Sequence, residues 1–83
     1  MTHPKREAVR SVLAAVEAPD WAAPNLDGLA DVLRDLSWLP EGSVRVAWVP
    51  PGDLDEPDRA AVETVLRHAV TETADGPRPI HLV

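Results

Sequence analysis

The sequence predicts an α/β fold in which a small parallel β-sheet, with two strands, is packed by three or four helices. Three segments place apolar residues at helical spacing. Two short runs rich in β-branched residues, 44–49 and 80–83, lie on either side of the third segment. Two strands joined through a helix run parallel with a right-handed crossover, so this order predicts a βαβ unit.

The first helix is expected close to the N-terminus. Pro4 suits a first helical turn, where its missing N–H has no intrahelical partner to lose. The apolar positions that follow it are Val9, Val12, Leu13 and Val16. This helix should end near Glu17, because Pro19 disfavours helical backbone at the residue before it. A loop bracketed by prolines, 18–24, follows.

The second helix combines an apolar side with a line of acidic residues. Asn25 is a favourable N-cap for it, and its apolar positions are Leu26, Leu29, Leu33 and Leu36. Asp27, Asp31 and Asp35 recur every four residues and so lie on one helix face. We call them the aspartate stripe, and we expect Asp27 and Asp31 at the boundary of core and solvent. Like charges at this spacing weaken an isolated helix by a few tenths of a kcal/mol per pair, which suggests a cationic partner.

The second half of the chain supplies the sheet and the third helix. Residues 44–49 are expected to form a strand that 50–52 (Pro-Pro-Gly) ends. The acidic run 55–58 predicts a helix start, because carboxylates are favourable near the positive end of the helix dipole. The apolar positions of this helix are Val62, Val65, Leu66, Ala69 and Val70. Gly76-Pro77 ends the region, and 80–83 form the last strand.

Length and composition limit the possible functions. Eighty-three residues are expected to form one domain, 1–83. The absence of cysteine excludes disulfides, thiolate zinc sites and cysteine nucleophiles, and it fits a reducing cytoplasm. Fourteen acidic and 8 basic residues give a net charge of −6, which opposes direct nucleic-acid binding and favours a basic partner. No apolar run approaches the roughly 18 residues of a membrane span. No motif indicates catalytic residues, a metal site or a cofactor.

An ordered set of motifs occurs along residues 8–83. It comprises Pro19-Asp20-Trp21, Asn25-Leu26-Asp27, Asp31, Trp38 and Trp48, the last within the first predicted strand. This set resembles the barstar family of small acidic inhibitors of barnase-type, guanyl-specific ribonucleases. The resemblance implies a barstar-like fold. It also implies that Asp27 and Asp31 enter the ribonuclease active site, where they replace RNA phosphates against arginine, lysine and histidine.

The partner-binding residues expected on this basis are Trp21, Asn25, Asp27, Asp31 and Asp35. Asp35 extends the stripe although the family pattern does not demand it, and its partner could instead be Arg34 or solvent. Trp21 lies where the family has an aromatic residue in the binding loop, but it could also pack on the second helix. Trp38 and Trp48 are expected in the core, and His68 on the surface.

The chain departs from the family at its N-terminus and on the second helix. The family usually opens with a strand, for which residues 1–3 are too few, so the sheet should keep two strands with open edges. Ala30 stands where the family often carries tryptophan. Ala23 and Gly28 also depart, and the loop glycine of the family is missing. Open strand edges can pair with another chain, which predicts self-association or low stability of the isolated monomer.

Together these features predict a cytoplasmic inhibitor of a secreted-type, basic ribonuclease, which acts by plugging the active site of that enzyme. Two alternatives remain open. The chain could be an immunity protein for a different basic toxin nuclease, using the same stripe. It could also be a non-inhibitory structural or regulatory subunit, which the missing strand and Ala30 would favour. An enzyme is not expected, because paired carboxylates that cleave glycosides need a cleft, for which a chain of this size offers little room.

Overall fold

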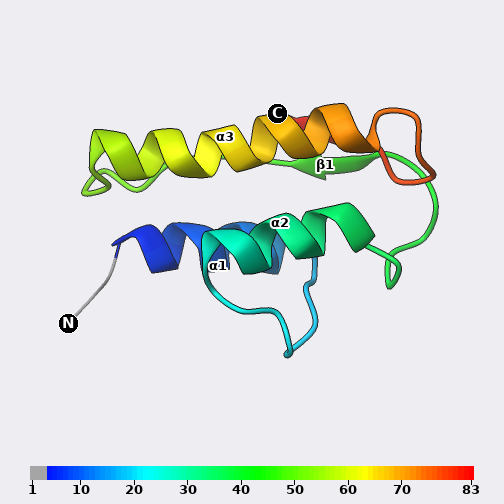
Figure 1. Ribbon diagram of the computed structural model, residues 1–83, viewed down its shortest axis with the longest axis horizontal. Coiled ribbons are helices and arrows are strands. Elements are labelled where there is room, and N and C mark those ends of the chain that lie inside the picture. The colour runs from blue at the N-terminus through cyan, green and yellow to red at the C-terminus, as the bar shows by residue number, and fades with distance from the viewer. Residues whose placement is uncertain (1–3) are drawn as a thin grey trace.

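A computed structural model describes residues 4–83, and the expectation that residues 1–3 form no strand lies outside this range. The elements, in chain order, are α1 (Pro4–Ala15), α2 (Leu26–Asp35), β1 (Val44–Val46), α3 (Glu56–Thr73) and β2 (Ile80–Leu82). Figure 1 shows α3 along the top of the view and α2 below it, with α1 alongside α2. Within the described residues there are three helices and one parallel sheet, which confirms the predicted α/β fold. No helix of this part of the chain is long and apolar enough to cross a membrane.

The sheet consists of β1 and β2, which run parallel as predicted. Val44 lies opposite Ile80, and Val46 lies opposite Leu82. A further backbone hydrogen bond, from the N–H of Val83 to the carbonyl oxygen of Val46 at 3.0 Å, extends the ladder beyond β2. The crossover between the two strands contains α3, which packs against β2. The βαβ unit is therefore built from residues 44–82.

The first strand is shorter than predicted, because it ends at Val46 rather than at residue 49. Beyond Val46 the chain is held by α3 instead of by the sheet. The indole N–H of Trp48 donates a hydrogen bond of 2.9 Å to Oε2 of Glu63, and Val49 is 81% exposed. Trp48 is half-buried and packs against the core, so its expected place inside the core is only partly correct.

The apolar faces of the three helices meet the inner side of the sheet in one core. Its largest fully buried side chains are Leu29, Leu33, Leu36, Leu66, Ile80, Val9, Val16, Val32, Val46 and Val62. Val32 is buried although the sequence pattern did not mark it, because α2 packs against both α1 and α3 and buries a wider face. Leu26, Val65 and Val70 were expected in the core, but they are only half-buried and pack against its margin.

The end of α1 sets the direction of the loop that leads to α2. The helix ends at Ala15, slightly before the predicted Glu17. Glu17 has a φ of 54°, in the left-handed region. Its N–H donates to the carbonyl of Ala14 at 3.1 Å, and the N–H of Ala18 donates to the carbonyl of Leu13 at 2.9 Å. This pair of bonds is a Schellman motif, which satisfies carbonyls left open at a helix end.

Candidate functional site

The aspartate stripe is positioned by the cap of α2. Asn25 has extended backbone, and its Oδ1 accepts a hydrogen bond of 2.7 Å from the N–H of Gly28. This bond satisfies one of the open donors in the first turn, and such a cap is worth about 1 kcal/mol to a helix. The first aspartate of the stripe follows the cap by two residues. Asn25 therefore holds the start of the helix that carries Asp27.

A glycine in the first turn of α2 lets the preceding loop close onto the helix. A Cβ atom at Gly28 would lie 2.2 Å from the carbonyl oxygen of Ala23 and 2.9 Å from its Cβ. Contacts this short between non-bonded atoms do not occur in packed proteins, so only glycine fits here without moving the loop. Sequence reasoning treated Gly28 as a departure from the family and missed this role. The detectable signal was a glycine three residues after the cap.

The three aspartates of the stripe are all exposed, rather than lying at the boundary of core and solvent as predicted for Asp27 and Asp31. The side chain of Asp31 is 64% exposed. The difference arises because the apolar side of α2 is centred on Leu29, Val32 and Leu33, which turns the acidic face fully outward. None of the three carboxylates is needed by the core.

One cation on the same helix pairs with the stripe. Arg34 Nη2 binds Oδ1 of Asp31, not the carboxylate of Asp35, which was its alternative partner. The spacing explains the choice, because residues three apart on a helix are neighbours whereas adjacent residues do not face each other. Within residues 4–83 no ion pair involves Asp27 or Asp35. Both pairing side chains are more than half exposed, so the pair contributes at most about 1 kcal/mol.

Trp21, in the loop before α2, packs against Trp38, which follows α2 in the sequence. The ring centroids of Trp21 and Trp38 are 6.1 Å apart, and the ring planes are at 86°, an edge-to-face arrangement. The indole N–H of Trp38 donates to the carbonyl of Val16 at 2.9 Å. Trp38 is half-buried against the core, and Trp21 remains 64% exposed. The loop thus presents a large aromatic surface whose orientation is fixed by a partner inside the fold.

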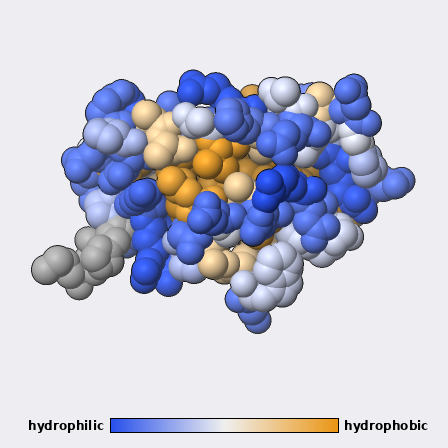
Figure 2. Space-filling model, viewed as in Figure 1, coloured by the Kyte–Doolittle hydropathy of each residue, from blue (hydrophilic) through white to orange (hydrophobic). Residues whose placement is uncertain are grey.

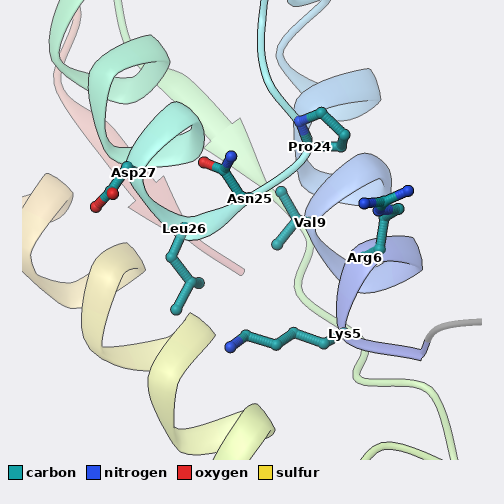
Figure 3. A pocket seen from close by; sticks show the side chains of 7 residues that line it. All are labelled: Lys5, Arg6, Val9, Pro24, Asn25, Leu26 and Asp27. Carbon is teal, nitrogen blue, oxygen red and sulfur yellow. The ribbon is translucent and has the colours of Figure 1, made fainter.

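An open pocket lies between the first turns of α1 and α2. Figure 3 shows its lining, which consists of Lys5, Arg6, Val9, Pro24, Asn25, Leu26 and Asp27. In this view the carboxylate of Asp27 lies across the pocket from Arg6 and is not directed at Lys5, the two cations of α1 that line the pocket. Lys5 is directed to α3 instead, where its Nζ lies 3.9 Å from Oδ1 of Asp58. Neither Lys5 nor Arg6 therefore forms an ion pair with the acidic face of α2.

The predicted site residues thus fall into two groups. Asp27, Asp31 and Asp35 share the exposed face of α2, and Asn25 and Trp21 belong to the loop that precedes it. His68 on α3 is exposed, as expected.

Comparison with known proteins places this arrangement in a family. Searches of the curated proteins and of the solved structures returned no match. The family model described as Barstar (barnase inhibitor) matches residues 2–83, nearly the whole chain. As this description says, the family comprises inhibitors of barnase-type ribonucleases rather than enzymes. The chain belongs to the barstar family.

Proposed function

We propose that this protein inhibits a basic, barnase-type ribonuclease in the cytoplasm by inserting the acidic face of α2 and the Trp21 loop into the active site of that enzyme. The observation that supports this most directly is the aspartate stripe, whose three carboxylates are exposed on a helix capped by Asn25. A stripe that the fold does not use, and that repels itself, is expected to be offset by a cationic partner.

The physical basis of inhibition is replacement of phosphate by carboxylate. A ribonuclease binds the phosphates of RNA with arginine, lysine and histidine side chains, and carboxylates form charge-assisted hydrogen bonds with the same groups. Because the aspartates sit on a helix fixed at its start and buried along Leu29 and Leu33, little backbone freedom is lost on binding. The inhibitor presents charges that are already in place.

The charge of the whole chain supports the encounter. A net charge of −6 attracts a basic enzyme and raises the association rate through long-range steering. The attraction is screened over roughly 8 Å at physiological ionic strength, so association should slow as salt is added. The same charge opposes binding to RNA itself.

Trp21 supplies the apolar part of the interface. Tryptophan is enriched among residues that dominate binding energy, and its contribution is greatest when its orientation is fixed beforehand. Trp38 fixes the ring of Trp21 edge-to-face and leaves most of its surface exposed. Truncation of Trp21 to alanine is expected to weaken binding by about 2 kcal/mol or more.

The experiment is a titration of the wild-type chain and of Asp31→Ala against a panel of basic ribonucleases that includes barnase. Asp31→Ala is expected to weaken inhibition by about 2–5 kcal/mol, because it leaves a buried cation of the enzyme unpaired. Asp53→Ala is the matched control, since it removes the same charge from an exposed loop residue before α3. Failure of the wild-type chain to inhibit any member of the panel would refute the proposal. Equal affinities of Asp31→Ala and wild type would show that the stripe is not the site.

A further inference from the structure

A shallow groove with an apolar floor and a polar rim runs between α2 and α3. Figure 2 shows apolar surface between these two helices, bordered by hydrophilic residues. The groove is lined by Ala30, Arg34, Val65, His68, Ala69 and Glu72. Its volume is about 170 Å³. By comparison, an apolar cavity of roughly 150 Å³ accepts one benzene ring.

The groove exists because the residue at its α2 wall is small. Ala30 is half-buried and contributes a single methyl group, so it leaves Val65 half-buried and uncovered on the neighbouring helix. Ala69, 4% exposed, closes the floor. Methyl groups on the floor offer no partner to a charged or hydrogen-bonding group, and a polar group placed there would lose its hydration without compensation. The chemistry of the floor therefore selects an apolar occupant.

The groove is continuous with the aspartate stripe. The link is Arg34, which lines the groove and also pairs with Asp31. An enzyme cation that takes the place of Arg34 at Asp31 therefore lies next to the groove. An apolar anchor seated in such a pocket, next to desolvated ion pairs, is the usual arrangement of an interface hot spot.

We propose that the groove between α2 and α3 receives one apolar, preferably aromatic, side chain of the target ribonuclease, placed beside the cations that bind the stripe. This inference rests on the proposed function and deepens it, because it identifies what the enzyme must carry next to its cationic active site. A ribonuclease with the same cations but a charged side chain at this point would place that charge against the methyl floor without compensation and would bind more weakly. The groove thus supplies specificity that a row of carboxylates alone does not.

The test fills the groove from the inhibitor side. The probe is the ribonuclease of the panel that the wild-type chain inhibits most strongly. Ala30→Trp is expected to weaken its inhibition about tenfold or more, since loss of one anchored side chain at an interface costs more than 1 kcal/mol. Ala30→Leu, a smaller filler that favours helix, is expected to act in the same direction. Ala60→Trp is the matched control, because Ala60 is exposed on α3 and lies outside the groove.

A direct readout uses the unmodified chain. The methyl resonances of Val65 should shift on addition of the inactivated enzyme, with the large upfield change that a stacked aromatic ring produces. Unchanged Val65 resonances in the complex would overturn the proposal, as would equal or tighter binding by Ala30→Trp and Ala30→Leu. If the wild-type chain formed a dimer that Ala30→Trp dissociates, the occupant would be a second copy, and the proposal would also fall.

The outcomes separate this inference from the proposed function. If Asp31→Ala loses inhibition while the Ala30 variants do not, the groove assignment is wrong and the function stands. If Asp31→Ala inhibits as well as the wild type, the active-site mode of inhibition itself is wrong. Thermal unfolding of each variant shows whether a loss of inhibition reflects loss of fold.

Discussion

Arg34 is expected to restrain the binding of the ribonuclease by occupying a carboxylate of the stripe. Its guanidinium pairs with Asp31 across one turn of α2, and the two side chains are 56% and 64% exposed. An enzyme cation that takes over Asp31 must displace this partner, and Arg34 itself repels a basic enzyme. Replacement of Arg34 by alanine should therefore strengthen binding rather than weaken it.

The magnitude follows from the exposure of the pair. Exposed ion pairs contribute about 0.2–1 kcal/mol. Arg34→Ala should therefore lower the dissociation constant by up to about fivefold, with most of the change in the association rate at low salt. Folding stability should change by no more than about 0.5 kcal/mol, since alanine has a high helix propensity and Arg34 is a surface residue. Stopped-flow association over a range of salt concentrations, with chemical unfolding in parallel, measures both effects.

The chain contains a matched control for the change in net charge. Arg59 pairs with Glu56 at the same three-residue spacing, but on α3. The hydrogen bond and the positive charge of Arg59 hold the pKa of Glu56 below its usual range. Arg59→Ala removes one positive charge in a similar helical setting, away from the stripe. Weaker binding by Arg34→Ala than by wild type, or equal gains for the two variants, would refute the assignment of a competing role to the Asp31–Arg34 pair.

Three further predictions concern the scaffold. Glu17→Gly should raise the unfolding free energy by about 0.5–1 kcal/mol, measured by denaturant titration, because Glu17 has a φ of 54°, a conformation that favours glycine. Gly28→Ala should lower stability, because overpacking against the loop costs about 1–3 kcal/mol. This cost outweighs the gain of about 1 kcal/mol in helix propensity. An unchanged or higher melting temperature would contradict the prediction. Thr73→Val should cost about 1–3 kcal/mol, because the amide of Ile80 donates to the Thr73 hydroxyl at 2.9 Å and would lose its acceptor at the edge of β2; it should also increase self-association in sedimentation experiments.

The fold followed from the sequence where one signal dominated. Apolar spacing located the three helices within residues 4–83, and the order of strand, helix and strand predicted the parallel pair. The early end of β1 could not be predicted in this way. Beyond Val46 the chain contacts α3, where Trp48 donates a hydrogen bond to Glu63, and these two residues become neighbours only when α3 packs. A β-branched run shows where a strand can form, whereas tertiary contacts decide how much of it pairs.

The candidate site shows the same division. Helical spacing placed the aspartates on one face and identified Asn25 as the cap, because both are properties of a single helix. The pairing of Arg34 with Asp31 rather than with Asp35 also follows from helical spacing, which favours a partner three residues away. The groove beside Ala30 could not be predicted from the spacing within α2, because its floor comes from α3. Surfaces made by two helices require the packing between them to be known.

The stiffness of α2 comes from the core and the cap rather than from its own sequence. Its first turn contains Gly28, which costs about 1 kcal/mol relative to alanine, and its exposed face carries repelling aspartates. Helices of this length, ten residues, are not stable in isolation. Burial of Leu29, Val32 and Leu33 and the cap by Asn25 offset these costs from the opposite side of the helix. Because stability is supplied by the buried face, the exposed face can hold the aspartates for a partner. Loss of the buried leucines should therefore abolish binding through loss of the helix. Changes in the stripe should alter binding and leave the fold intact.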